Sequence, residues 1–169
     1  MEINPALQRA TDTGTAGVIA RPPLLFLAAL LIGFGADHLL RLPFPVGRTG
    51  ALHWISAINA GFLILAGIAV FAAGIRGFSG AGTPVQGTRP ARTLVTTGIH
   101  AWSRNPIYLG MFLVYAGIGV AVRSPWILIV GLPLCIAIRF GVVAREEAYL
   151  ERRFGDAYRD YKARVHRWV

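Results

Sequence analysis

Four long apolar segments dominate the pattern of the chain and predict membrane-spanning helices. They cover residues 24–40, 52–75, 106–122 and 125–143. The second is long enough to cross a bilayer core of roughly 30 Å at about 1.5 Å per residue. Only Arg123 and Ser124 separate the last two, which predicts a tight helical hairpin. Pro106 and Pro125 suit the first turn of a helix, where the missing N–H would be unpaired anyway. The pattern predicts an all-α, polytopic membrane protein with about four transmembrane helices.

Two polar segments complete this single membrane domain of residues 1–169. Residues 76–105 are rich in Gly, Pro and Thr, and irregular backbone of this kind cannot lie in lipid, so we expect a cytoplasmic loop. Residues 145–165 place aromatic and apolar side chains at spacings of three to five, interrupted by Gly155. They predict an amphipathic cytoplasmic helix at the membrane surface. The polar stretch 2–15 lacks a signal-peptide pattern, so the first apolar segment is expected to stay in the mature protein.

Composition and charge agree with a membrane protein. Of the 169 residues, 54% are hydrophobic and only 15% are charged, a balance that a small soluble domain could hardly tolerate. The net charge of +9 comes from basic residues that flank the apolar segments without forming a continuous patch, so we expect no nucleic-acid partner. Lys and Arg concentrate in the N-terminal stretch, the central loop and the C-terminal segment. This bias predicts that both termini lie in the cytoplasm, and we expect the membrane to be a bacterial inner membrane.

Candidate chemistry is densest in TTGIHAWSRNPIYLG, residues 96–110. Asn105 suits the N-cap of the third span, and a helix start beside Arg104 could hold a carboxylate or phosphate. Gly98 could let backbone approach a ligand, and Tyr108 offers a ring face or a hydroxyl. A structural interpretation stays open for each residue: Asn105 and Pro106 as a helix start, Arg104 as a topology anchor, Tyr108 as an aromatic-belt residue.

Two further features add charge near this stretch. Glu146 and Glu147 could receive the cationic amine of a ligand whose carboxylate lies at the helix start, or could form a solvated face. Arg139 lies inside the fourth apolar segment, where an ionisable group indicates function by default. It precedes Glu146 by seven residues, so both would share a helix face. Arg139 either orients an acceptor or cofactor, or snorkels or forms a structural ion pair. No group of His, Cys and carboxylates has metal-ligand spacing, so we expect no metal.

Taken together, these motifs resemble a known family. The pattern T-x-G-x(5)-R-[HN]-P-x-Y-x-G, an E-E pair roughly 35 residues later and F-G-x-x-Y-x-x-Y-x-x-x-V lie within residues 94–167. This arrangement is similar to the isoprenylcysteine carboxyl methyltransferase and phospholipid methyltransferase family of integral membrane enzymes. The resemblance implies that S-adenosyl-L-methionine binds between the last spans and a cytosolic cap, without a Rossmann fold.

The resemblance also implies site residues. The cofactor-binding set would be Gly98, His100, Arg104, Asn105, Pro106, Tyr108, Gly110, Glu146 and Glu147. The catalytic set would be Glu147 and Arg104 together with Arg139, which is included for its place inside the fourth apolar segment and not because of the resemblance. One position departs from the pattern, since eukaryotic members usually have His where this chain has Asn105. An amide can cap and hydrogen-bond but cannot titrate, so we assign Asn105 no proton transfer.

The implied activity is S-adenosylmethionine-dependent methyl transfer to a lipophilic acceptor that enters from the bilayer. Carboxyl O-methylation of an isoprenylcysteine-like substrate is the leading hypothesis and needs no base. A phospholipid N-methyltransferase is a second hypothesis, and its amine acceptor would need Glu147, Glu146 or His100 as the base. An NADPH-dependent membrane reductase of the sterol reductase type, which has a similar R-H-P-x-Y motif, is a third. The fourth is a non-enzymatic small membrane protein.

Overall fold

The computed structural model describes residues 17–45, 49–85 and 90–169, and all regular elements in these ranges are helical. The polar stretch 2–15 lies outside the described residues. In chain order the elements are α2 (Pro22–Leu39), α3 (Ala51–Gly80), the 3-10 helix η1 (Gly98–Ala101), α4 (Pro106–Ala121), α5 (Pro125–Ile138), the π-helical turn η2 (Arg139–Val143), α6 (Ala144–Phe154) and α7 (Asp156–Arg164).

Three of these helical stretches are long and apolar enough to cross a membrane: Pro22–Leu39, Ala51–Gly80 and Pro125–Phe154. The fourth apolar helix, α4, is shorter at 16 residues. Proline occupies the first turn of α2, α4 and α5, and Ser124 caps α5 by accepting a hydrogen bond from the N–H of Ile127 at 3.0 Å. The all-α, polytopic membrane fold predicted from the sequence is confirmed.

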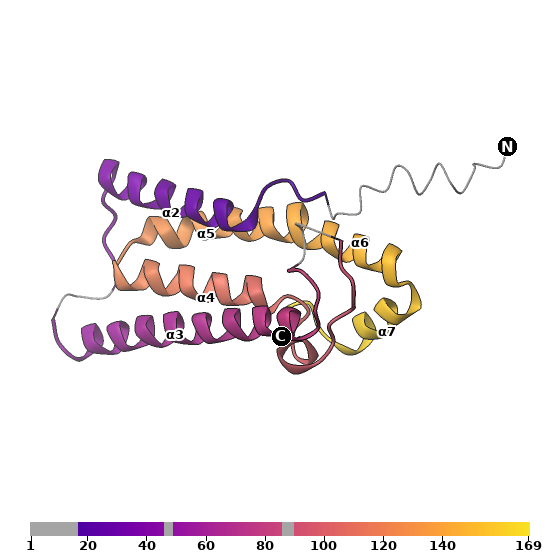
Figure 1. Cartoon of the computed structure of the whole chain (residues 1–169). Helices are drawn as coiled ribbons and strands as arrows, with labels where there is room; N and C mark the ends of the chain where they lie inside the picture. Colours follow the sequence, from indigo (N-terminus) through magenta and orange to yellow (C-terminus); the bar gives the residue numbers. More distant parts are fainter. Residues whose placement is uncertain (1–16, 46–48, 86–89) are drawn as a thin grey trace.

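The helices pair through small residues. Figure 1 shows α3 beside α4 and α2 beside α5, with α6, α7 and the loop between α3 and α4 gathered at one end. Gly67 and Gly110 face each other across α3 and α4, where a Cβ on Gly67 would lie 2.7 Å from the Gly110 carbonyl oxygen. On the other pair, a Cβ on Gly33 would lie 2.7 Å from a side-chain atom of Ile127. Small residues let membrane helices approach this closely.

The central loop is shorter than the sequence predicted. Helix α3 continues to Gly80, five residues beyond the predicted end at Ile75. The segment from Arg76 to Gly80 contains no proline, and the helix stops only before Gly82, whose φ of 62° lies in the left-handed region. The loop therefore begins after Gly80 and contains the short helix η1.

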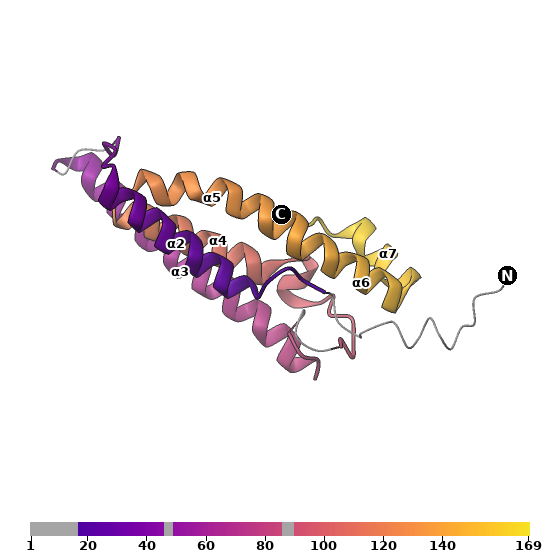
Figure 2. The ribbon, with the colours of Figure 1, turned by 90° about the horizontal axis from the view of Figure 1, so that it is seen from above.

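The predicted single helix 145–165 is wrong in two ways. Helix α6 continues α5 directly through η2, so it is not a separate helix (Figure 2). The helix then breaks at Gly155, whose φ is 55°, and α7 folds back beside α6 (Figure 1). A left-handed residue ends an α-helix, and glycine adopts this conformation at little steric expense.

A small aromatic core fixes α6 and α7 against the central loop. Its buried members are Ala91, Tyr149, Leu150, Tyr158 and Tyr161. The backbone N–H of Ala91 donates to the Tyr149 hydroxyl at 3.1 Å across 58 positions of the chain. The loop before α4 and the helices after α5 therefore form one cap over the end of the bundle.

Candidate functional site

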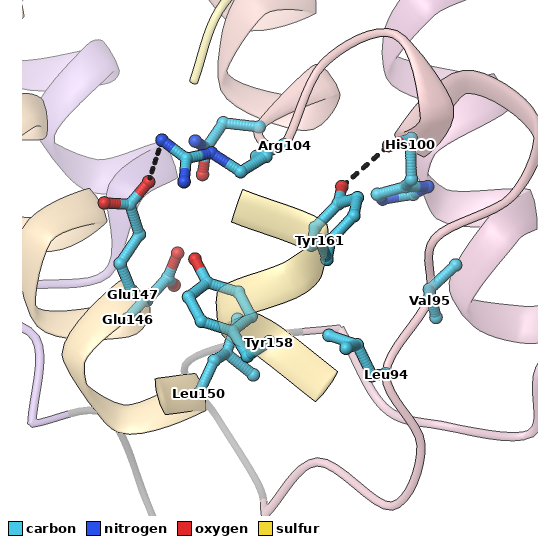
Figure 3. Close-up of a pocket in the computed structure, with 10 residues that line it drawn as sticks. Leu94, Val95, His100, Arg104, Glu146, Glu147, Leu150, Tyr158 and Tyr161 are labelled. Carbon is cyan, nitrogen blue, oxygen red and sulfur yellow. Dashed lines mark hydrogen bonds and ion pairs between the residues drawn. The ribbon is translucent and has the colours of Figure 1, made fainter. Parts of the chain in front are cut away.

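A polar cavity lies beneath this cap, where η1, the start of α4, α6 and α7 meet (Figure 3). Its lining residues are Leu94, Val95, His100, Arg104, Asn105, Glu146, Glu147, Leu150, Tyr158 and Tyr161. The cavity has room for roughly one water molecule. The sequence motif and the glutamate pair are thus brought to one place.

An ion pair joins the two halves of the site. Arg104 precedes α4 and its Nη2 lies 3.2 Å from Oε1 of Glu147 on α6, as Figure 3 shows. Only 9% of the Arg104 side chain and 8% of the Glu147 side chain is exposed. Within the described part of the chain, Nε and Nη1 of Arg104 are buried without a hydrogen-bond partner. The guanidinium therefore has two nitrogens available for an anion.

A second link connects α4 to α6. The Tyr108 hydroxyl donates a hydrogen bond of 2.8 Å to Oε1 of Glu146, and both residues are buried. No described residue hydrogen-bonds the other carboxylate oxygen of Glu146, which is also buried. Burying a carboxylate away from water is unfavourable unless a partner satisfies it. A cationic or hydrogen-bonding ligand group at Oε2 would supply that partner.

His100 is the residue of η1 that lines the cavity. The Tyr161 hydroxyl donates to the His100 carbonyl at 2.7 Å, and the imidazole packs edge-on against Phe78 with ring centroids 4.9 Å apart. Gly77 makes room for the ring, because a Cβ there would lie 2.9 Å from it. Among the described residues, neither ring nitrogen has a hydrogen-bond partner. Burial lowers the pKa of His100, which favours the neutral imidazole.

Asn105 holds the N-cap position of α4, but its side chain does not cap the helix. The prediction of a capping side chain is therefore wrong. The Asn105 Nδ2 instead donates to the Arg167 carbonyl at 3.1 Å, and the Asn105 N–H donates to Ser103 Oγ at 3.2 Å. Pro106, the next residue, is fully buried in the first turn of α4. The amide thus connects the start of α4 to the C-terminal segment.

Five predicted site residues do not line the cavity. Two of them, Pro106 and Tyr108, line a neighbouring pocket together with His100, Arg104 and Asn105. Arg139 is exposed, with its guanidinium 5.3 Å from the centre of the Phe140 ring. Residues seven apart share a face only in a regular α-helix, and η2 has more residues per turn, so Arg139 and Glu146 point in different directions. Gly110 faces α3. Gly98 begins η1 with a φ of 62°, and nothing lies within 4 Å of a Cβ built on it.

Besides the apolar lining residues Leu94, Val95 and Leu150, sequence reasoning missed three residues with polar groups at the site. Tyr158 and Tyr161 lie on one face of α7 and line the cavity. Their i, i+3 spacing within the F-G-x-x-Y-x-x-Y motif was the available signal. Arg167 pairs with Glu147, with its Nε 3.0 Å from Oε1 and its Nη2 2.6 Å from Oε2. No local pattern marks Arg167, because its role depends on a contact across 20 positions of the chain.

The arrangement suits a ligand that carries both charges. Buried polar atoms in folded proteins nearly always have a partner. Here, five such atoms on His100, Arg104 and Glu146 have none among the described residues, and all three side chains line the same cavity. An anionic group would satisfy Arg104, and an ammonium group would satisfy Glu146. The donor set therefore fits the carboxylate and ammonium of an amino-acid moiety.

The chain is similar to known methyltransferases. The profile of the phospholipid methyltransferase family matches residues 55–157, more than half of the chain. The chain is 34% identical over 143 residues to a protein-S-isoprenylcysteine O-methyltransferase of Dictyostelium discoideum, a match covering 83% of this chain and 58% of that protein. It is 36% identical over 120 residues to the protein of the same name from Rattus norvegicus, covering 66% of this chain and 40% of that protein. No solved structure matches the chain.

The fold and site thus define an all-α membrane protein with a buried polar site at one end of its helix bundle. The chain belongs to the phospholipid methyltransferase family. It spans about half the length of the two relatives above. The matched range contains the Arg104–Glu147 ion pair and ends before Tyr158, Tyr161 and Arg167.

Proposed function

We propose that this protein is an S-adenosylmethionine-dependent membrane methyltransferase that O-methylates the carboxylate of an isoprenylcysteine-like acceptor. The observation that carries the proposal is the buried cluster of Arg104, Glu147, Glu146 and Tyr108, whose unpartnered atoms suit an amino-acid moiety. The family and the names of the two relatives support methyl transfer and the acceptor class.

Residues of the cluster would divide the work of holding the cofactor. Arg104 would bind the carboxylate through Nε and Nη1, and Glu146 and Glu147 would bind the ammonium. Bound S-adenosylmethionine supplies an electrophilic methyl group on a sulfonium. Leu94, Leu150 and other apolar side chains of the lining would exclude water from that group. The protein would mainly have to align the reacting groups, because the displacement proceeds in line.

An apolar groove between α2, α3 and α4 supports a lipophilic acceptor. Its volume is about 290 Å³. Its lining residues are Pro23, Phe26, Leu30, Ile68, Phe71, Met111, Val114, Tyr115 and Ile118. Helix α4 connects groove and site, since Tyr108 contacts Glu146 and Met111, one turn later, lines the groove. We propose that the acceptor chain enters from the bilayer along this groove, with its head group near Tyr108.

A second candidate is N-methylation of a phospholipid amine. This reaction requires loss of a proton from the acceptor, whereas a carboxylate acceptor requires none. The unpartnered Oε2 of Glu146 favours this candidate, because a carboxylate in the site could accept that proton.

We also propose that the site faces the cytoplasm of a bacterial inner membrane, with both termini on the same side. The supporting observation is the excess of Lys and Arg in the segments that adjoin the site.

The test uses purified full-length protein in lipid nanodiscs with methyl-tritiated S-adenosylmethionine. An S-farnesylated N-acetylcysteine should gain label that base releases as methanol, the signature of a methyl ester. The methyl ester of the same compound is the blocked control and should gain none. Label that enters phosphatidylethanolamine and resists base would favour the second candidate.

Two variants test whether the methyl-transfer activity depends on this site. Arg104→Ala should abolish labelling, because it removes the anion-binding guanidinium, whereas Arg152→Ala removes an exposed arginine of α6 and should preserve labelling. No labelling of either acceptor by wild-type protein, or equal labelling by Arg104→Ala, would contradict the proposed function.

A further inference from the structure

The C-terminal segment lies directly on the candidate site. Residues 165–169, here called the strap, follow α7 in extended or bent backbone. The N–H of Arg104 donates to the His166 carbonyl at 3.0 Å, and the Asn105 side chain donates to the Arg167 carbonyl at 3.1 Å. Arg104 and Asn105, both in the segment 96–110, therefore bind the backbone of the strap.

The strap also supplies a cation to the site. The Arg167 guanidinium makes two charge-assisted hydrogen bonds to the Glu147 carboxylate, at 3.0 and 2.6 Å. Such a bidentate pair is among the stronger polar contacts in proteins. Both carboxylate oxygens of Glu147 thus contact a guanidinium of the strap, and Oε1 also contacts Arg104. An incoming ammonium would have to displace Arg167 to reach Glu147.

An aromatic contact holds the end of the strap. The Trp168 ring packs edge-on against Phe112 of α4, with centroids 6.2 Å apart, at the border of the main apolar core. The cavity beside the strap, lined by residues outside the strap, holds roughly one water molecule. With Arg167 on its carboxylate, Glu147 is closed to an incoming ammonium.

We propose that the strap is an autoinhibitory latch, in which Arg167 takes the place of the cofactor's ammonium on Glu147 and Trp168 anchors the closed position. The proposal rests on the proposed function, because it assigns Glu147 to the ammonium of S-adenosylmethionine. Cofactor binding then requires the strap to leave. Anything that weakens the latch strengthens cofactor binding.

Calorimetry of S-adenosylmethionine binding in nanodiscs tests the latch. Arg167→Met keeps the apolar stem and removes the guanidinium, and we expect it to lower the Kd roughly tenfold. Trp168→Ala should lower the Kd too, without touching a polar atom of the site. Arg164→Met is the matched control: Arg164 is exposed and its Nε bonds the Asp160 carbonyl of its own helix, so the Kd should not change. An unchanged or raised Kd in both Arg167→Met and Trp168→Ala would overturn the latch.

Fluorescence gives a readout independent of affinity. In protein whose other tryptophans, Trp54, Trp102 and Trp126, are replaced by Phe, emission comes from Trp168 alone. The latch predicts a red shift when S-adenosylmethionine is added, because Trp168 leaves Phe112 for water. Binding by calorimetry with no shift, or with a blue shift, would overturn the latch and leave the proposed function standing. Absence of binding by wild-type protein and by all variants would overturn the proposed function and the latch with it.

Discussion

The Tyr108 hydroxyl lies 2.8 Å from Oε1 of Glu146, its hydrogen-bond acceptor 38 positions later in the chain. This contact joins the first turn of α4 to α6 and holds one carboxylate at the cavity. Both side chains are buried, so neither can exchange its partner for water. The contact therefore contributes to stability as well as to the geometry of the site.

Replacing Tyr108 by Phe should destabilise the protein by about 1–3 kcal/mol, because it leaves a buried carboxylate without its donor. Removing both polar partners is less unfavourable than removing one. The double variant Tyr108→Phe, Glu146→Leu should therefore recover part of the loss. Thermal unfolding in detergent of the two single variants and the double variant measures this coupling. Additive destabilisation would show that the hydrogen bond contributes nothing.

Arg104→Lys should weaken S-adenosylmethionine binding about 10- to 100-fold. Lysine keeps the charge but lacks the planar fork, so it cannot contact Glu147 and a ligand carboxylate in the way a guanidinium does. Calorimetry in nanodiscs measures the change, with Arg152→Lys on the exposed face of α6 as the matched substitution. Equal affinity of both variants would remove Arg104 from the proposed binding set.

The buried imidazole of His100 predicts a loss of stability in mild acid. Its pKa lies below the usual value of about 6.5, so below that pH the unfolded chain takes up a proton that the folded protein does not. Stability is therefore fully present above pH 6.5 and falls as the pH drops, by at most about 1.4 kcal/mol per pH unit from this group.

His100→Gln should reduce that pH dependence, because an amide does not titrate. Denaturant unfolding at pH 7.5 and 5.5 gives the comparison, and His166→Gln, at an exposed position of the strap, is the control. An undiminished loss of stability in His100→Gln would assign the acid sensitivity to other groups.

A pair of glycines separates helix packing from helix propensity. A Cβ on Gly110 would lie 2.6 Å from the Gly67 carbonyl oxygen, whereas nothing lies within 4 Å of a Cβ on Gly61. Gly110→Ala should destabilise the protein by about 1–3 kcal/mol through overpacking. Gly61→Ala, the same chemical change on α3, should be neutral or stabilise it by up to about 1 kcal/mol. Thermal unfolding checks both, and a similar effect of the two would contradict the close approach of α3 and α4.

The sequence predicted those parts of the fold that depend on local chemistry. The lengths of the apolar segments predicted the helices, and Pro106 and Pro125 predicted where two of these helices begin. At the candidate site, the family resemblance pointed to Arg104 and Glu147, which form an ion pair, and their role in binding a ligand stays a prediction. Gly110 was also assigned to the site, but it packs against α3. A motif does not distinguish a residue that contacts a ligand from one that contacts a helix.

Other features depend on contacts between distant segments. Because the π-helical turn has more residues per turn than an α-helix, Arg139 does not lie on the same helix face as Glu146. No periodicity in the sequence indicates this π-helical turn. Arg167 reaches Glu147 only because Gly155 turns α7 back toward α4, so its position in the sequence carries no signal of that pairing. Such features follow from tertiary packing.

The unbroken helical path from α5 through η2 to α6 links the site to the lipid. This continuous helical stretch, Pro125–Phe154, has 30 residues and is about 45 Å long, whereas the hydrocarbon core of a bilayer is roughly 30 Å thick. Glu146 and Glu147 lie on this stretch, which is long and apolar enough to cross a membrane, whereas Arg104 precedes a different helix. Membrane helices adjust to bilayer thickness by tilting. If this helix tilted against α4, the separation of Arg104 and Glu147 would change, and the thickness of the host membrane would then act on the geometry of the site.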